Sequence, residues 1–548
     1  MINAMSKVAQ YLNEHLLGEV TTSDGARRHF STDASVLSIV PDMVIYPRVT
    51  SDIRKVARFS WQLAEKGHKL PITARGGGSD QTGAAIGPGV ILDLKAHMDM
   101  IFEVDAKQRL VRVQPGVTFK ALNEALRLQG LYIPAFPASQ AFSTIGGAIA
   151  NNASGVLSGK YGSMQAWVKQ LEVILSNGEV LQTGRISKRE VEKKKGLQTF
   201  EGELYRNIDS LIIDSDKLIE TIAIDVRDNV GYNIVDAKRK DGSIDLTPLF
   251  IGSQGTLGVV SEVILRCDQL PQAPLVCGIA FPDTNSLRDA IDMLMPLSPS
   301  IFEVVDGRLL ARAVKNGSKF PFYNDALDKG DVAAVAVLEF DDNSPRHKHK
   351  IAKKIAKMFE ELPPYVALEE KENNIADLRI IASLPNVVLA PSKTNLSDPG
   401  VLYGAYIPSE RMEDFSKAIA TLESKYHIEM PLSGHASQSV YHGRILLDMK
   451  KPADKQKVLK LLAEWSVIVS AHGGHLIGEA GEGRLKAIFA YKELDPGVVQ
   501  MFASIRDIFD PMGIMNTGVK QTGDLKKLVE ALRSDFDGTD FADYVEGN

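Results

Sequence analysis

The chain has 548 residues, of which 44% are hydrophobic and 24% charged, and its formal net charge at pH 7 is −6. This composition excludes a disordered or fibrous protein, and the length exceeds what one hydrophobic core supports, so we expect two or three domains. The negative charge gives no general attraction to nucleic acid or to an anionic membrane. The sequence has two cysteines, Cys267 and Cys277, which are too few for a four-thiolate iron–sulfur cluster and do not imply a disulfide framework.

The first 20 residues mix polar and charged side chains where a secretory signal peptide would need an apolar run. No stretch of about 18 apolar residues occurs, so we expect no transmembrane segment. These features predict a soluble cytoplasmic protein and leave peripheral attachment at the inner membrane as an alternative.

In chain order, the pattern predicts helices and strands that alternate irregularly. Residues 1–18 are spaced as an amphipathic helix, and a helix that begins near Ser51 and ends at Gly67 follows a short strand. Strand-like segments follow at 68–78, 90–105 and 109–117, a helix at 119–130, and a hairpin with an Asn-Gly turn at 168–184. The pattern up to residue 270 is mixed α and β without a regular βαβ repeat.

A proline-rich seam, CDQLPQAPLV, predicts a domain boundary near residue 270, and a second boundary is expected near residue 495. Two nucleotide motifs are excluded. The glycines at 76–78 lack the G-x-G-x-x-G spacing of a Rossmann site. GVLSGKYG (155–162) is one residue short of a Walker loop and has Tyr161 where a magnesium-binding Ser or Thr should stand.

Glycine and small residues cluster in four places in the first half of the chain: 74–84, 137–155, 160–164 and 249–262. Any one cluster is explained by tight turns. Three consecutive glycines after a strand, as in ITARGGGSDQTGAA, favour a backbone pressed against a ligand whose charged oxygens need N–H donors.

These clusters resemble the FAD-binding domain of the vanillyl-alcohol oxidase/p-cresol methylhydroxylase flavoproteins. FSTDAS (30–35), VRVQPGV (111–117), NVGYN (229–233) and FDPMGIMNTGVK (509–520) extend the resemblance over most of the chain. Within that family the sequence is most similar to the D-lactate dehydrogenase/glycolate oxidase/D-2-hydroxyglutarate dehydrogenase branch.

The resemblance implies an α+β protein in three parts. Residues 1–270 would form a two-part FAD-binding domain of the vanillyl-alcohol oxidase type. Residues 271–495 would form an α+β substrate (cap) domain with an antiparallel sheet. Residues 496–548 would form a C-terminal segment that packs back on the FAD domain.

The resemblance also implies which residues hold FAD. The loop from Arg75 to Gly83 would wrap the pyrophosphate with backbone N–H groups, and Ser79 stands where some branches attach FAD through a histidine, so we expect non-covalent FAD. The residues expected to bind FAD are Arg75, Gly76, Gly77, Gly78, Ser79, Gln81, Thr82, Gly83, Pro137, Ser143, Thr144, Gly146, Gly147, Asn151, Gly155, Gly162, Gly252, Gly255, Thr256, Gly258, Val259 and Asn516.

GHASQSVYHGRILLD (434–448) places His435 and His442 seven residues apart, a spacing that by itself is usually incidental. It is similar to the branch pattern H-x-G-D-G-N-x-H, with SQSV in place of GDGN. Downstream, GGHLIGEAGEGRLK (473–486) matches the branch at Glu479. The resemblance implies a divalent metal such as zinc held by His435, His442 and Glu479, ligands that suit such an ion.

Ala480 departs from the branch, which has its histidine base at this position. Another group must then accept the proton, or the reaction differs. His475 and His472 lie nearby in the sequence, with a solvated or core role as an equal alternative, and Tyr406 and Tyr441 are further candidates.

The resemblance places Arg379 where the branch has a carboxylate-binding arginine, a role that suits its planar guanidinium. Ser383 and Lys393 fall at or near two further substrate contacts. The alternative for Arg379 is an ordinary surface helix residue.

The expected function is FAD-dependent oxidation of a 2-hydroxy acid, of the D-lactate, D-2-hydroxyglutarate or glycolate type, with hydride transfer to flavin N5. Electrons would leave to a quinone, an electron carrier, oxygen or an iron–sulfur partner subunit. Two alternatives remain: a flavin transferase like alkyl-dihydroxyacetone-phosphate synthase, and a degenerate FAD subunit of an electron-transfer complex, which Ala480 favours.

Overall fold

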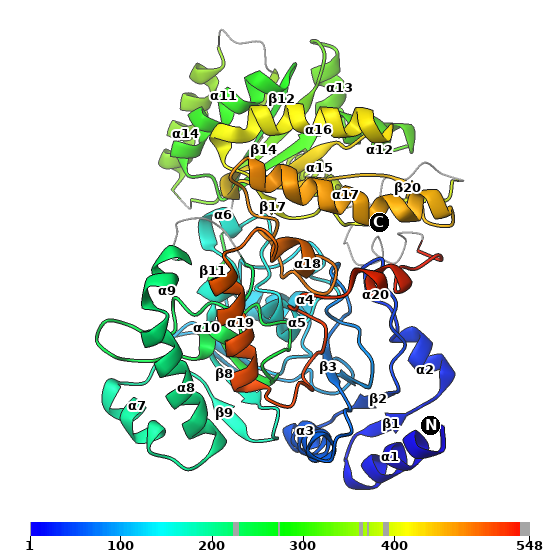
Figure 1. Cartoon of the computed structure of the whole chain (residues 1–548). Helices are drawn as coiled ribbons and strands as arrows, with labels where there is room; N and C mark the ends of the chain where they lie inside the picture. Colours follow the sequence, from blue (N-terminus) through cyan, green and yellow to red (C-terminus); the bar gives the residue numbers. More distant parts are fainter. Residues whose placement is uncertain are drawn as a thin grey trace.

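The computed structural model describes residues 2–222, 229–271, 274–342, 344–360, 365–369, 372–386 and 394–536. It has two lobes, one above the other in Figure 1. The lower lobe contains a four-stranded and a five-stranded sheet, and the upper lobe contains a seven-stranded sheet flanked by helices. This mixture is the α+β class expected from the sequence.

The four-stranded sheet has the order β1-β2-β4-β3, in which β2, β4 and β3 are parallel and β1 is antiparallel. Helix α3 connects β2 to β3 and begins at Thr50, one residue before the predicted start. Its buried Asp52 accepts hydrogen bonds from the N–H groups of Leu17, Gly18 and Arg48, which fixes the entry to β1. The elements are α1 (Ile2–His15), β1 (Glu19–Thr21), α2 (Asp24–His29), β2 (Met43–Tyr46), α3 (Thr50–Glu65), β3 (Ile72–Arg75) and β4 (Val90–Asp93).

The five-stranded sheet is antiparallel, with the order β5-β6-β10-β8-β9. The predicted hairpin is β8–β9, and Gly178 in its turn has a φ of +83°. The predicted strand at 90–105 is split between this sheet and the first one. The strands are β5 (Ile101–Asp105), β6 (Leu110–Val113), β8 (Val168–Ile174), β9 (Val180–Gln182) and β10 (Val259–Arg266), with β7 (Leu131–Tyr132) pairing separately with β11 (Asp268–Gln269). The helices are α4 (Phe119–Arg127), α5 (Ile145–Ala150), α6 (Ser158–Tyr161), α7 (Lys188–Lys195), α8 (Phe200–Asp214), α9 (Asp216–Ile222) and α10 (Thr247–Phe250), with a short η1 (Met164–Ala166).

The upper lobe is built on an antiparallel sheet with the order β15-β12-β14-β13-β18-β19-β17. Every residue of β12 and β14 is buried because helices cover both faces. Alternate residues of β12 pack into two different cores, Val276 and Ala280 with α12, α13 and α15, and Cys277 and Phe281 with α11 and α14. The strands are β12 (Leu275–Phe281), β13 (Ile301–Asp306), β14 (Ala334–Phe340), β15 (Tyr365–Glu369), β17 (Ala405–Tyr406), β18 (Leu432–His435) and β19 (Val440–Gly443), with a separate pair β16 (Leu396–Ser397) and β20 (Leu447–Asp448). The helices are α11 (Thr284–Leu294), α12 (Gly307–Lys315), α13 (Pro321–Leu327), α14 (Pro345–Met358), α15 (Glu372–Ser383), α16 (Met412–Tyr426) and α17 (Pro452–Ala471), with short η2 (Met295–Leu297), η3 (Leu384–Asn386), η4 (Ser409–Arg411) and η5 (Ala436–Gln438).

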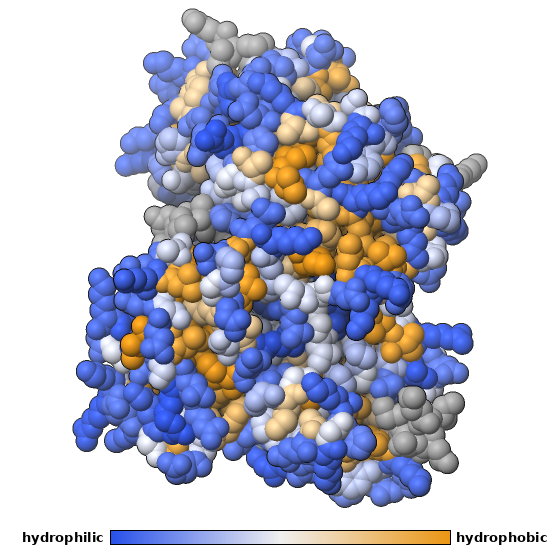
Figure 2. Space-filling view, in the orientation of Figure 1, coloured by the Kyte–Doolittle hydropathy of each residue, from blue (hydrophilic) through white to orange (hydrophobic). Residues whose placement is uncertain are grey.

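The chain then returns to the lower lobe. The N–H of Ile72 in β3 donates to Ile514 O at 2.8 Å, and the N–H of Asn516 donates to Ile72 O at 2.8 Å. The last elements are α18 (Ala487–Ala490), α19 (Pro496–Phe509) and α20 (Leu525–Glu530). Figure 2 shows a mostly hydrophilic face, with hydrophobic patches where the lobes meet and smaller ones on each lobe. Within the described ranges, no helix combines the length and apolar character needed to cross a membrane.

Candidate cofactor pocket and active site

A pocket containing about 1500 Å³ of empty space, part of it open to solvent, is lined by residues of both lobes. The loop after β3 and the start of α5 form the side that belongs to the lower lobe. Gly400 and Tyr403 reach it from the upper lobe, and Glu479 and Ala480 from the segment that leads back. The predicted FAD residues that line it are Arg75, Gly76, Gly77, Gly78, Ser79, Gln81, Thr82, Pro137, Ser143, Thr144, Gly146, Gly147, Asn151, Gly255 and Gly258.

Close packing explains the glycine run after β3. A Cβ atom on Gly76 would lie 2.0 Å from Thr144 Oγ1, and one on Gly77 would lie 2.1 Å from Phe142 O. Gly78 has a φ of +73°, which side-chain-bearing residues rarely adopt. The loop therefore packs closely against the segment before α5, and its glycines present backbone without side chains at the pocket wall, which suits a phosphate-bearing ligand.

Asp80, which is not among the residues predicted from the sequence, shapes this loop. Its carboxylate accepts hydrogen bonds from the N–H groups of Thr82 and Ala84, at 2.9 and 2.8 Å, and from Asn151 Nδ2 at 3.0 Å. An aspartate that bonds the N–H two residues later is typical of a turn, and that short-range signal is present in S-D-Q-T.

Arg75 braces the loop against the FSTDAS segment. Its guanidinium donates to Thr32 O at 2.7 Å and to Ala85 O at 3.2 Å. Asp33 of the same segment is fully buried; burial, and secondly the charge of Asp80, raises the pKa of its carboxyl to about 7.

Seven predicted FAD residues do not line the pocket: Gly83, Gly155, Gly162, Gly252, Thr256, Val259 and Asn516. Two of them, Asn516 and Thr256, support segments of its wall from behind. Asn516 Nδ2 donates to Ala84 O at 2.9 Å and to Gln254 O at 2.7 Å, and Thr256 Oγ1 donates to Ser253 O at 2.7 Å. Any direct contact of these seven residues with FAD stays a prediction.

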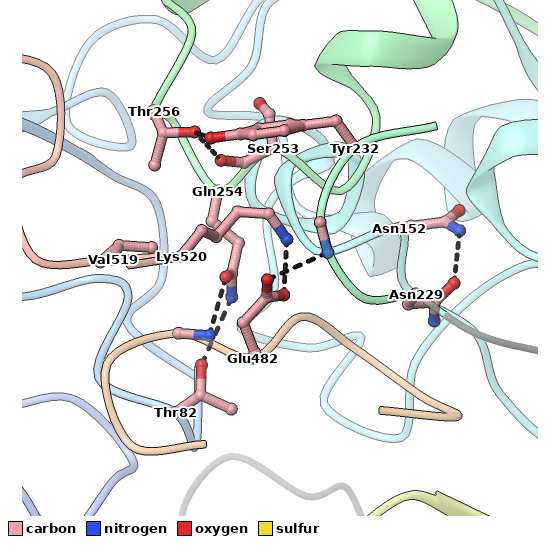
Figure 3. Close-up of polar contacts among 12 residues, drawn as sticks. Thr82, Asn152, Asn229, Tyr232, Ser253, Gln254, Thr256, Glu482, Val519 and Lys520 are labelled. Atoms are coloured by element: carbon pink, nitrogen blue, oxygen red, sulfur yellow. Dashed lines mark hydrogen bonds and ion pairs between the residues drawn. The ribbon is translucent and has the colours of Figure 1, made fainter. Parts of the chain in front are cut away.

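A buried network joins the pocket-wall segments (Figure 3). Gln254 accepts the N–H of Gly483 at 2.9 Å and donates to Thr82 Oγ1 at 3.3 Å. Glu482 accepts the N–H of Gly231 at 3.0 Å and pairs with Lys520. Five segments that are separate in the sequence thus fix one another.

The structure brings His435, His442 and Glu479 together, all buried, with candidate ligand atoms within 4.8 Å of one another. The two histidines lie on the same face of the β18–β19 hairpin, because His442 opposes Ser433 and His435 opposes Val440. This explains the seven-residue spacing.

The spacing of the trio fits a shared ion. Glu479 Oε2 lies 3.5 Å from His435 Nε2 and 3.9 Å from His442 Nε2. Such separations are long for hydrogen bonds and suit ligands that each approach a metal at about 2.0–2.2 Å. Glu303 lies directly opposite His435 in β13, and its Oε1 is 2.5 Å from His435 Nδ1. His435 Nε2 therefore faces the other two members of the trio. A carboxylate on the second ring nitrogen is the usual support of a ligating histidine.

Of the two histidines, His442 is the less suited to bind a metal. The N–H of Gly404 donates to its Nδ1 at 2.9 Å. A neutral ring that accepts at Nδ1 carries its hydrogen on Nε2, so ligation through Nε2 requires that this hydrogen bond be given up. Burial lowers the pKa of His442 well below its usual range. At His435 burial acts in the same direction, but the carboxylates of Glu303 and Glu479 outweigh it and raise the pKa to about 10.

Tyr403 and Lys486 complete the pocket near Glu479. The Tyr403 ring stacks on His442 with 4.0 Å between ring centroids, and Lys486 Nζ donates to Tyr403 O. Tyr403 was missed because only tertiary folding brings this cap segment to the loop that contains Glu479.

The predicted catalytic residues are not gathered at the pocket. Arg379 pairs with Glu339 at 2.9 Å and its side chain is half exposed. His475 lies in an extended segment that pairs with Tyr406, where the N–H of Tyr406 donates to His475 O at 2.9 Å. Neither lines the pocket. Lys393 lies outside the described residues.

The further candidates have structural contacts. His472 Nδ1 lies 2.7 Å from Ile468 O at the end of α17, and Ser383 Oγ donates to Ile380 O at 2.8 Å. Tyr441 is the neighbour of His442 in β19 and therefore points to the opposite face of the sheet.

Residues 41–184 match the family model of the FAD binding domain, and residues 270–519 match that of the C-terminal domain of FAD linked oxidases. Together the two matches cover more than half of the chain. The chain belongs to the FAD-linked oxidases. The protein thus has the FAD-binding and oxidase domains that its pocket and its two lobes suggest.

This FAD-linked oxidase is 26% identical to a D-2-hydroxyglutarate dehydrogenase of Haemophilus influenzae, over 98% of this chain and 54% of that protein. It is also 26% identical to the glycolate oxidase subunit GlcD of Bacillus subtilis, over 93% of this chain and 96% of that one. The chain spans about half the length of the D-2-hydroxyglutarate dehydrogenases that it matches. The structure of p-cresol methylhydroxylase superposes with a TM-score of 0.70 at 15% identity, over 96% of this chain and 98% of that one, which shows the vanillyl-alcohol-oxidase-type fold.

Proposed function

We propose that this chain oxidises a 2-hydroxy acid of D configuration to the 2-oxo acid in an FAD-dependent reaction. The observation that carries the proposal is the position of Glu479, which belongs both to the pocket lining and to the trio with His435 and His442. A substrate placed against the cofactor would therefore lie close to Glu479 of the trio. The similarity to D-2-hydroxyglutarate dehydrogenase and glycolate oxidase supports a substrate of the D-2-hydroxyglutarate, D-lactate or glycolate type.

The pocket fits non-covalent FAD. Gly76 and Gly77 leave no room for side chains, and the loop that Asp80 shapes would hold the pyrophosphate through its N–H groups. Ser79 offers no imidazole for covalent attachment and lies 2.9 Å from Ser143 Oγ. FAD, when bound, accepts the hydride from the substrate carbon.

His435, His442 and Glu479 would hold a divalent metal such as zinc. Such an ion supplies Lewis-acid polarisation of a substrate oxygen and attraction for a carboxylate. Glu303 would hold the His435 ring in place for this role. Arg379 is proposed as a further carboxylate contact, which requires that its guanidinium exchange Glu339 for the substrate.

We further propose that electrons leave to a quinone, an electron carrier or an iron–sulfur partner subunit. The two cysteines of the sequence, Cys267 and Cys277, are too few to hold a four-thiolate cluster. A cytoplasmic location, with peripheral association at the inner membrane as the alternative, belongs to the same proposal.

The test is anaerobic absorption spectroscopy of the purified flavoprotein mixed with paired D- and L-2-hydroxy acids. Rapid loss of the oxidised flavin band with one D enantiomer would support the proposal. An oxidised flavin untouched by the whole panel, yet reducible by dithionite, would contradict it. That outcome would favour the transferase or the degenerate electron-transfer subunit, for which Ala480 in the pocket lining is the supporting observation.

A further inference from the structure

Lys486 is a buried cation at the end of the pocket nearest the upper lobe. Its residue is 2% exposed and belongs to the pocket lining together with Tyr403, Glu479 and Ala480. Its Nζ donates to the backbone oxygen of Tyr403, so the ammonium is tied to the cap segment. The family assignment gives this lysine no role, and the proposed oxidation above does not use it.

The charges around the pocket are distributed unevenly. Of the described lining residues, Asp80 and Glu479 are acidic and Arg75 and Lys486 are basic. The Arg75 guanidinium is bound by the carbonyl oxygens of Thr32 and Ala85 on the side of the glycine loop. The other end of the pocket is formed by Tyr403 and Glu479. The basic residue of the described lining at that end is Lys486.

A ligand that gains electrons at this end meets opposing charges. The Glu479 carboxylate disfavours added negative charge, and a neighbouring ammonium favours it, both more strongly in a buried site than in water. Burial lowers the pKa of Lys486 to about 8, while Glu479 and Asp80 act in the opposite direction, so the ammonium form predominates at pH 7. Charge close to the flavin ring is one of the means by which a protein tunes this cofactor.

We propose that Lys486 provides the positive charge that stabilises reduced FAD in this pocket and so raises its midpoint potential. In the two-electron reduction, oxidised FAD takes up a hydride equivalent and gains one negative charge, which faces the ammonium. The inference depends on FAD binding and on the ring lying at the cap end, and it does not depend on which substrate is oxidised.

The experiment compares the midpoint potentials of holoenzyme variants by equilibration with reference dyes at pH 7, without any hydroxy acid. Lys486→Met removes the charge and the donor, Lys486→Gln keeps a donor without the charge, and Lys486→Arg keeps the charge. Lys492→Met is the matched control, because Lys492 is an exposed lysine six residues further along that does not line the pocket. FAD stoichiometry is measured alongside for every variant.

We expect both neutral variants to disfavour the reduced form at least tenfold, a fall of about 30 mV for a two-electron couple. Lys486→Arg should stay within about threefold of wild type, and Lys492→Met should be unchanged. A wild-type potential in Lys486→Gln, or a fall in Lys486→Arg equal to that in Lys486→Met, would overturn the proposal. Loss of FAD in all three Lys486 variants would also overturn it, because the residue would then hold the pocket together rather than tune the flavin. Since dyes replace the substrate, the result is independent of the proposed oxidation.

Discussion

The Glu482 carboxylate and the Lys520 ammonium lie 2.5 Å apart, and both side chains are completely buried. Glu482 belongs to the segment that carries Glu479 and Ala480, and Lys520 to the C-terminal segment that returns to β3. Glu482 also accepts the N–H of Gly231 and the hydroxyl of Tyr491, at 3.0 and 2.7 Å. One ion pair thus ties together three parts of the pocket wall.

Removal of one partner should therefore destabilise the lower lobe strongly. Lys520→Met leaves an uncompensated buried carboxylate, for which we expect a loss of about 3–5 kcal/mol in the free energy of unfolding. The double variant Glu482→Met/Lys520→Met should recover part of this loss. The measurement is urea denaturation followed by flavin and tryptophan fluorescence, with the exposed Lys526→Met as control. Equal midpoints for Lys520→Met and wild type would show that the pair is dispensable.

Gly77→Ala should abolish retention of FAD. The new Cβ would lie 2.1 Å from the backbone oxygen of Phe142, so one of the two pocket loops must move. We expect FAD content to fall at least tenfold, measured as the ratio of flavin to protein absorbance after gel filtration. Gly25→Ala is the control, since a Cβ there has no neighbour within 4 Å. A fully flavinated Gly77→Ala protein would mean that this loop is not part of the cofactor site.

The metal ligands should contribute unequally. His435→Gln should lower zinc affinity more than His442→Gln. Glu303 supports His435 as a ligand. The N–H of Gly404 instead donates to Nδ1 of His442, which is the nitrogen that must carry the ring hydrogen when Nε2 binds a metal. Glu303→Gln should lower the affinity about 10–100-fold without touching the ion. Chelator competition followed by elemental analysis measures all three, with Asp414→Asn, a change at an exposed carboxylate, as control. Wild-type protein free of bound metal after loading would contradict the site, and equal losses at the two histidines would contradict the asymmetry.

Stability should depend on the ionisation of Asp33. Because its pKa is raised to about 7, the native state binds more protons than the unfolded state between about pH 4 and 7. Stability therefore falls as the pH rises through this window, and the penalty is complete above pH 7. Asp33→Asn removes this penalty, so on going from pH 5 to pH 8 the variant should gain about 3 kcal/mol of stability relative to wild type.

Urea unfolding at both pH values measures this difference for Asp33→Asn. Asp99→Asn, a change at an exposed carboxylate, is the control. A stability difference that does not change with pH would show that Asp33 is ionised throughout the range.

Part of the lining of the candidate pocket was predictable from short stretches of sequence. The glycine run after β3 and the cluster around Thr144 contain most of the predicted residues that line the pocket, and the glycines permit the close approach that Gly76 and Gly77 make. The spacing of His435 and His442 was also informative, since a seven-residue interval across a hairpin puts both rings on one face.

Short stretches of sequence did not reveal which way individual side chains face. Asn516 and Thr256 stand in the right segments, yet their side chains hold the wall from behind, a distinction that depends on which way a loop faces. Arg379 lies on a helix as expected, but Glu339 of β14 occupies its guanidinium. His475 is near Glu479 in sequence, but its segment pairs with Tyr406 instead.

The sequence by itself determined the mixed α and β pattern and the glycine loop after β3, because these follow from local backbone freedom and residue spacing, and the resemblance of its motifs to a flavoprotein family singled out the buried trio. Only the tertiary structure decided that Tyr403 and Lys486 meet Glu479, that Glu303 supports His435, and that Glu482 pairs with Lys520. Each of these contacts joins residues from separate segments, and their energy comes from burial and charge pairing that exist only once the lobes have closed around the pocket.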